Sequence, residues 1–188
     1  PCVMISSISL AEGPMVFDAL ENGAVDYIQK PEAKDIAELT PTIVEKVKMA
    51  ANVRSGTRKD AKNVAKVQVK SSKDSLVVIG SSTGGTEALR EILTALPDEI
   101  PPILIVQHIP PVFSLAFAKR MNELCNFEVI EGQNGDEVKP NRVIVAPGGS
   151  QMKMVRRNGK TFVEINDDAP VNRFKPSVDY LFKSVADN

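Results

Sequence analysis

Apolar and helical segments alternate along the second half of the chain. Four apolar runs are predicted to be strands: LVVIG, ILIVQH, FEVIEG and RVIVAPG. Between the first three of these runs lie TEALREILTAL and FSLAFAKRMNELC, whose apolar residues recur at i, i+3 and i+4 as in an amphipathic helix. Continuous apolar strands that alternate with helices are typical of a parallel sheet covered on both faces. This part of the chain is therefore predicted to be α/β, with a doubly wound, mostly parallel sheet.

The same periodicities predict the elements at both ends of the chain. MKMVRRNGKTFVEI is expected to form a hairpin with Asn158–Gly159 as its turn, and KPSVDYLFKSVA is expected to begin a last helix. In the first part, VMIS and AVDYIQKP are predicted strands on either side of a helix at residues 13–22. Residues 35–53 have helical spacing but contain Pro41, so that helix is expected to begin near the proline.

Composition changes sharply at Arg54. Basic residues outnumber acidic ones from Arg54 to Lys73, and bulky apolar residues are scarce there. Such a segment cannot bury enough surface to fold alone, and a solvated basic tether is favoured over a segment that binds nucleic acid or a membrane. The predicted organisation is thus a first domain at residues 1–53, a linker at 54–74 and a second domain at 75–188.

Overall composition narrows the class of protein. A hydrophobic content of 43% is enough for a core, and a net charge of −1 argues against a nucleic-acid binder. No apolar run is long enough for direct membrane insertion. Cys2 and Cys125 are isolated, like the reduced thiols of cytosolic proteins, so a cytoplasmic location is expected. The chain stops at Asn188 within or just after an apolar-periodic segment, which suggests a piece of a longer protein.

The loop SSTGGT, between the first strand and first helix of the second domain, either holds an anion or presents a nucleophile. A glycine-rich turn at a helix N-terminus offers backbone N–H groups and the positive end of the helix dipole to an anion. However, Thr86 and Glu87 follow the glycines, so the Walker lysine is missing, and the GxGxxG spacing is not met either. A serine on a tight strand-to-helix turn has the placement of a nucleophile elbow, although GxSxG is also not met.

A serine nucleophile needs a base, and the chain contains one histidine, His108. It ends the next strand, and strands joined through one helix are usually neighbours about 4.8 Å apart. The carboxyl ends of parallel strands lie on one edge, where open α/β sheets bind ligands. Taken alone, the histidine is more often a structural residue and the loop more often a helix cap. Their coincidence on one edge favours a serine hydrolase.

These motifs resemble a known family. IGSSTGGTEAL, QHIPPVFSLAFAKRMNELC, NGDEVKPNRVIVAPGG and DDAPVNRFKPSVDYLFKSVA are similar to the catalytic domain of the bacterial chemotaxis protein-glutamate methylesterases. The similarity runs from Ser75 to the end of the chain. The first part, with MIS and YIQKP, resembles the second half of a response-regulator receiver domain, which is flavodoxin-like. A receiver joined by a linker to this esterase domain is the family's own arrangement.

The resemblance implies roles for five residues. The family's nucleophile falls on Ser82 and its histidine on His108. Thr83 occupies the adjacent threonine position, which is expected to support the site. In the receiver part, Ser6 and Lys30 match residues that contact the phosphoryl group.

The implied reaction is hydrolysis of glutamate γ-methyl esters on methyl-accepting chemoreceptors, with deamidation of glutamines by the same route and without a metal or cofactor for catalysis. A chemotaxis histidine kinase would phosphorylate the receiver of the full-length protein, with Mg²⁺, and so relieve a block of the active site. The family's triad aspartate and phosphorylated aspartate are expected outside this chain, so the catalytic domain is expected to be C-terminally truncated and impaired. Two alternatives stay open: a flavodoxin-like anion- or flavin-binding module, and a non-catalytic signalling module.

Overall fold

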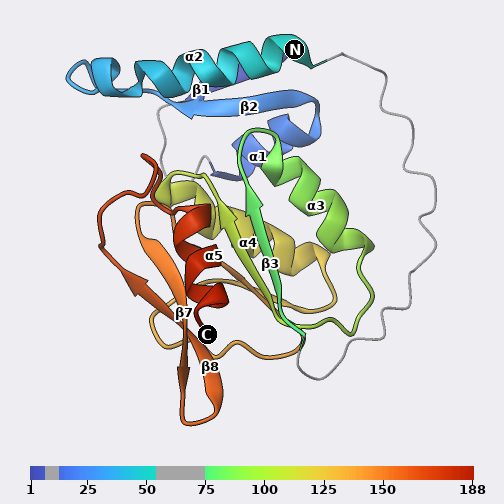
Figure 1. Ribbon diagram of the computed structural model, residues 1–188. Helices are drawn as coiled ribbons and strands as arrows, with labels where there is room; N and C mark the ends of the chain where they lie inside the picture. The colour runs from blue at the N-terminus through green and yellow to red at the C-terminus, as the bar shows by residue number, and fades with distance from the viewer. Residues whose placement is uncertain (7–12, 54–74) are drawn as a thin grey trace. The chain divides into compact units, whose positions relative to one another are not determined.

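Four parallel strands form the central sheet of the second half of the chain. Their order is β3-β4-β6-β5, with β3 at Val77–Ser81, β4 at Ile103–Gln107, β6 at Arg142–Val145 and β5 at Glu128–Glu131. The computed structural model in Figure 1 describes residues 1–6, 13–53 and 75–188. β3 and β4 are neighbours, as expected for parallel strands joined through one helix, and every residue of β4 is buried. The predicted α/β class with a parallel sheet is thereby confirmed.

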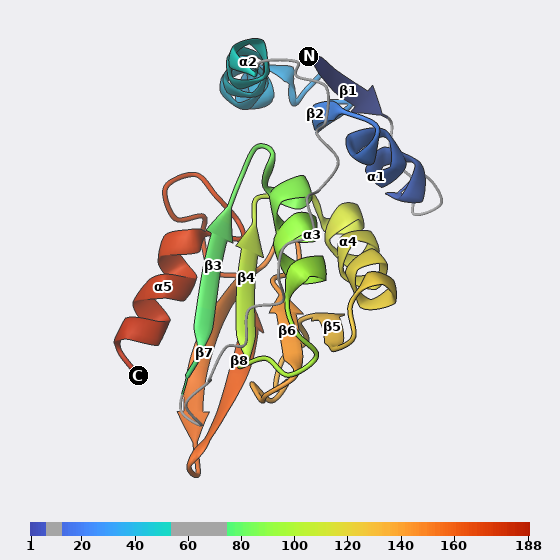
Figure 2. The same cartoon turned by 90° about the vertical axis from the view of Figure 1, so that its right-hand side faces the viewer.

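Helices lie on both sides of this sheet, as Figure 2 shows. α3 (Gly85–Ala95) and α4 (Pro111–Leu124) follow β3 and β4 and lie on one side. α5 (Val178–Ala186) lies on the other side. The antiparallel hairpin of β7 (Gln151–Arg157) and β8 (Lys160–Asn166) packs against α5 and the sheet.

The core beside the hairpin is aliphatic. One buried cluster joins β4, the end of β6, the hairpin and α5: Leu104, Val106, Ile144, Ala146, Met152, Met154, Val163 and Leu181. Because side chains alternate along a strand, Ile103 and Ile105 of β4 face the other side, where α3 and α4 lie. Burial of each large aliphatic side chain stabilises the fold by about 1.5–3 kcal/mol. The register of β4 is therefore strongly fixed on both faces.

Two predictions about turns and boundaries have different outcomes. The hairpin turns at Asn158 and Gly159, whose φ angles of 52° and 74° suit a two-residue type I′ turn, so this prediction is confirmed. The helix that was expected to begin near Pro41 instead spans Ile36–Asn52, with the proline inside it, so that boundary is wrong. Pro41 is the sixth residue of the helix, so it lacks the N–H of an intrahelical hydrogen bond there, yet the helix continues on both sides of it. The Thr40 hydroxyl donates to the Ile36 carbonyl in the same turn (2.6 Å).

The first part of the chain forms a separate compact unit. β1 (Cys2–Ser6) and β2 (Ala24–Gln29) pair in parallel, with α1 (Gly13–Glu21) between them in sequence and α2 (Ile36–Asn52) after them. The predicted linker at residues 54–74 lies outside the described residues. Among the helices that are described, none combines the length and apolar character needed to cross a bilayer.

Candidate active site

Ser82 and His108 lie side by side at the carboxyl edge of the central sheet. Ser81 is opposite Gln107 in the parallel pair of β3 and β4, so the next residue of each strand leaves the sheet at the same place. The His108 N–H donates to the Ser81 carbonyl (3.1 Å), which extends the ladder by one step. The distance from Ser82 Oγ to His108 Nδ1 is 3.2 Å, which is within hydrogen-bonding reach.

The exposure of the two side chains suits a nucleophile and its base. Ser82 is exposed, so its hydroxyl is accessible to a substrate, whereas His108 is half-buried. For Nδ1 to accept the serine proton, the neutral imidazole must carry its own proton on Nε2. A serine hydroxyl is a weak nucleophile until a base takes its proton. The pair therefore has the geometry required for acyl transfer.

A buried glutamine, which was not predicted from the sequence, joins the two strand ends. Gln107 is 3% exposed. Its Nε2 donates to the carbonyls of Ser82 (2.9 Å) and His108 (3.2 Å), and its Oε1 accepts the Ser81 hydroxyl (2.6 Å). The hydroxyl of Ser81 is thus engaged in the interior, whereas that of Ser82 faces the imidazole. This difference separates the roles of the two consecutive serines.

Two glycines make room for the arrangement. Gly84 precedes α3 with φ of 74°, in the left-handed region that favours glycine. Gly85 begins α3, and a Cβ there would lie 2.1 Å from Gln107 Oε1 and 2.8 Å from Ser81 Cβ. The turn therefore brings the helix backbone directly against the glutamine. Thr83, which was predicted to support the site, lies in this turn and is half-buried.

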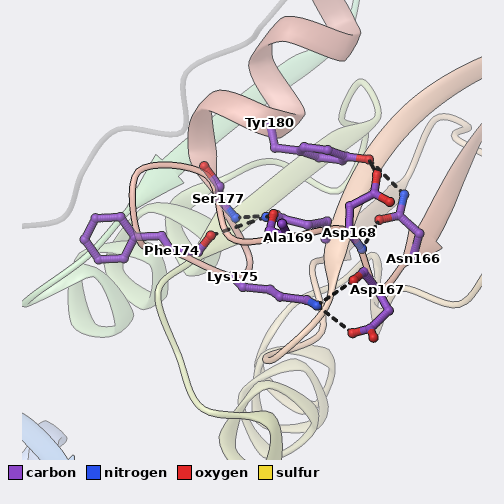
Figure 3. A network of polar contacts seen from close by, with 9 residues as sticks. Asn166, Asp167, Asp168, Ala169, Phe174, Lys175, Ser177 and Tyr180 are labelled. Atoms are coloured by element: carbon purple, nitrogen blue, oxygen red, sulfur yellow. Dashed lines mark hydrogen bonds and ion pairs between the residues drawn. The ribbon is translucent and has the colours of Figure 1, made fainter. Parts of the chain in front are cut away.

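The loop between β8 and α5 brings an aromatic ring onto His108. The rings of Phe174 and His108 stack with their centroids 3.8 Å apart and 4° between their planes. Phe174 closes a tight turn through reciprocal backbone hydrogen bonds with Val171 (3.0 and 3.1 Å). In Figure 3 the Phe174 ring points away from the polar network of the loop. The loop therefore contributes an apolar face to the site.

Gln151 of β7 anchors this loop from the interior. Its side chain is fully buried, at 0% exposure. Nε2 donates to the carbonyls of Ala169 (3.1 Å) and Phe174 (3.3 Å), and Oε1 accepts the N–H of Ser177 (2.8 Å). Neither Gln151 nor Phe174 was predicted from the sequence, because their contacts join segments that are remote along the chain.

Polar groups close the base of the loop (Figure 3). Lys175 pairs with Asp167 (2.5 Å), and this hydrogen bond holds the pKa of the Asp167 carboxyl below its ordinary value. The Tyr180 hydroxyl donates to Asp168 (2.5 Å) and accepts from Asn166 (2.9 Å). Partial burial, followed by the bond to Asp168, raises the pKa of Tyr180. These contacts bring the two ends of the loop together.

In the first unit, Ser6 and Lys30 lie at one edge. Ser6 is opposite Gln29 in the parallel pair of β1 and β2, and the Lys30 N–H donates to the Ser6 carbonyl (2.8 Å). Lys30 is exposed and Ser6 is half-buried. Within the described ranges, no group of three or more His, Cys, Asp or Glu side chains could hold a metal ion. A Mg²⁺ site is therefore not assigned to any of these residues.

Comparisons with known proteins identify the family to which the second part of the chain is similar. Residues 77–188 match the family model described as CheB methylesterase. The chain is 40% identical to the protein-glutamate methylesterase/protein-glutamine glutaminase of Pectobacterium atrosepticum and to that of Salmonella typhimurium, over 193 and 191 residues; each alignment covers 99% of this chain and 55% of the relative. The solved catalytic domain of the Thermotoga maritima CheB methylesterase matches with a TM-score of 0.58 and 39% identity, over 60% of each chain. The chain thus spans about half the length of the curated relatives that it matches.

Proposed function

The chain belongs to the CheB methylesterase family, and on that premise we propose that it hydrolyses γ-methyl esters of glutamate side chains, with Ser82 as nucleophile and His108 as general base. The observation that carries the proposal is the 3.2 Å distance from Ser82 Oγ to His108 Nδ1. The relatives are named both methylesterase and glutaminase, so the ester and the amide of the same carboxyl group are both proposed substrates. The proteins that carry them are proposed to be methyl-accepting chemoreceptors.

In the proposed reaction, Ser82 Oγ attacks the γ-carbonyl carbon while His108 Nδ1 takes the hydroxyl proton. The tetrahedral oxyanion collapses, the bond from the carbonyl carbon to the methoxy oxygen breaks, and the imidazolium protonates the departing methoxide. Methanol leaves and an acyl-serine remains. Water then attacks the acyl-serine with His108 again as base, which restores the Ser82 hydroxyl and releases a free γ-carboxylate. With a glutamine substrate the same sequence releases ammonia.

The start of α3 is proposed to stabilise the oxyanion. Ser82 lies just before Gly84, the N-cap of α3, and so at the positive end of the helix dipole. The first N–H groups of a helix have no acceptors within that helix. In known hydrolases the loss of one oxyanion donor lowers turnover by about 10²–10³-fold. The backbone of the turn, including that of Thr83, is thus the proposed donor set.

The first unit is proposed to be a receiver that controls this activity. Ser6 and Lys30 share one edge of the pair of β1 and β2, and a hydroxyl and an ammonium are suitable donors to phosphoryl oxygens. The proposed phosphoryl donor is a chemotaxis histidine kinase in the cytoplasm. In the native-length protein, a small acyl phosphate with Mg²⁺ should raise ester hydrolysis, and Lys30→Ala should abolish that response. An unchanged rate with wild-type protein would count against this control.

Paired serine variants of the native-length protein test the nucleophile. Ser82→Ala should lower methyl-ester hydrolysis by more than about 10³-fold. Ser81→Ala removes only the hydroxyl that donates to Gln107, so it should cost about 1 kcal/mol of stability and keep most of the turnover. A fluorophosphonate should label wild-type and Ser81→Ala protein but not Ser82→Ala.

The same experiment separates the alternatives. Loss of turnover on Ser81→Ala alone would show that Ser82 is not the nucleophile. A yellow chromophore retained through purification, without labelling, would favour a flavin-binding module. Labelling of Ser82 would count against both the flavin-binding and the non-catalytic signalling alternatives.

A further inference from the structure

Phe174 is the aromatic residue through which the loop between β8 and α5 meets the proposed base. We infer that Phe174 is a positioning residue for His108, held in place by Gln151. This inference rests on the proposed function, because it takes His108 to be the general base. Phe174 itself is assigned no contact with the reacting atoms; it acts through the imidazole.

The stack fixes the plane of the imidazole. With ring centroids 3.8 Å apart and 4° between planes, a large rotation of the His108 ring about its Cβ–Cγ bond would drive its edge into Phe174. The allowed plane is the one in which Nδ1 lies 3.2 Å from Ser82 Oγ. Phe174 therefore fixes the plane of the imidazole, and within that plane the orientation with Nδ1 toward Ser82 is the one that can accept the serine proton.

The stack also stabilises the positive charge that His108 acquires during the proposed reaction. When His108 takes the Ser82 proton it becomes an imidazolium, and a cation close to an aromatic face is attracted by the quadrupole of the ring. Attractions of this kind correspond to roughly 2- to 30-fold in a rate or equilibrium constant. The neutral imidazole gains less, so the stabilisation falls mainly on the charged transition state. Such an interaction raises kcat more than it changes KM.

Gln151 fixes the backbone that carries the Phe174 ring. Its buried Nε2 donates to the Phe174 carbonyl and to that of Ala169, and its Oε1 accepts the N–H of Ser177. Backbone groups on both sides of Phe174 are therefore attached to β7, the hairpin strand that packs in the core. Replacement by an apolar residue would leave the buried N–H of Ser177 without its acceptor and the two part-buried carbonyls without these donors, which is unfavourable. The contacts explain why an amide is buried at this position.

NMR on the 188-residue chain tests the stack without requiring turnover. The sequence contains one histidine, so the imidazole C–H signals belong to His108. A parallel ring at this distance should shift those signals upfield in wild-type protein and in Phe174→Tyr, and the shift should disappear in Phe174→Leu. Imidazole signals of wild-type protein at their unstacked positions would overturn the inference.

Kinetics on the native-length protein test the consequence. Phe174→Leu should lower kcat for methyl-ester hydrolysis by roughly 2- to 30-fold with little change in KM, and Phe174→Tyr should restore most of it. Phe182→Leu makes the same chemical change at an exposed position of α5 and should leave kcat unchanged. If Phe174→Leu fails to fold, Phe174→Met, which conserves side-chain volume, takes its place.

An isosteric substitution of Gln151 tests whether this residue holds Phe174 in place. Gln151→Glu keeps the shape of the side chain but removes its Nε2 donors, so it should weaken both the upfield shift and kcat. Hydrolysis by wild-type protein together with full kcat in Phe174→Leu would overturn the inference and leave the proposed function standing. If wild-type protein hydrolyses no methyl ester, the proposed function fails, and the NMR shift still reports whether Phe174 orients His108.

Discussion

Substitution of Gly85 by alanine has two effects of opposite sign on the stability of the protein. Alanine is more favourable than glycine within a helix by about 1 kcal/mol, and Gly85 begins α3 without a positive φ that would demand glycine. Propensity alone thus predicts a more stable protein. The new Cβ, however, would lie 2.1 Å from Gln107 Oε1, far inside the normal contact distance.

The magnitude follows from what Gln107 would lose by moving away. Its side chain makes three hydrogen bonds, to the hydroxyl of Ser81 and to the carbonyls of Ser82 and His108. Each contributes about 0.5–1.5 kcal/mol, so their partial loss outweighs the gain in helix propensity. We expect net destabilisation of about 2 kcal/mol, which for a chain of this length lowers Tm by roughly 4–8 °C.

Thermal unfolding followed by circular dichroism measures the change in Tm, and kcat for ester hydrolysis measures any effect on the site that Gln107 supports. Gly84→Ala is the matched control, because nothing lies within 4 Å of its Cβ; it should lose about 1–2 kcal/mol through its left-handed backbone while Gln107 keeps its hydrogen bonds. In a Gln107→Ala background, Gly85→Ala should cost clearly less, because only the contact with Ser81 (2.8 Å to its Cβ) remains. An unchanged or higher Tm for Gly85→Ala alone, or an equal loss in both backgrounds, would refute the steric explanation.

Two further predictions concern the first unit. Lys46→Met removes the ammonium that lies 3.0 Å from the buried Asp26 carboxylate, and it should destabilise this unit by about 2–3 kcal/mol; urea unfolding with an unshifted midpoint would contradict this. Burial, followed by the charge of Asp26, raises the pKa of Tyr27 well above its ordinary value, so the folded state keeps the phenol proton longer than the unfolded state. The resulting stabilisation is complete below about pH 10 and is lost as the pH rises further. Tyr27→Phe should remove this alkaline loss in unfolding measured between about pH 8 and 11, and identical pH profiles for the two proteins would argue against it.

The parallel sheet could be predicted because its central strands, β4 and β6, are buried on both faces. β4 is buried at every position, and such a strand appears in the sequence as a continuous apolar run. The hairpin was equally accessible, because Asn158–Gly159 accepts the positive φ angles of its turn. The start of α2 could not be predicted, because the helix runs through Pro41 from Ile36 despite the backbone hydrogen bond that the proline lacks. A proline within a helical pattern therefore does not by itself show where the helix begins.

The pairing of Ser82 with His108 could be predicted because the chain has one histidine and because neighbouring parallel strands end together. Gln107 is visible in the sequence as an amide at the end of an apolar strand, but its partners depend on the register between β3 and β4. Phe174 and Gln151 carried no local signal at all. Their contacts exist only after the hairpin and the loop have folded against the sheet.

Gln107 and His108 are consecutive residues, and their adjacency limits which mutations β4 tolerates. Successive side chains leave an extended backbone in opposite directions, so the amide enters the interior while the imidazole turns toward the serine. Deletion of one residue within β4 would bring the imidazole to the interior position of Gln107, and insertion of one residue would bring the amide to the position of His108 beside the serine. β4 can therefore accept the substitution of one apolar residue by another, but not the insertion or deletion of a residue before His108.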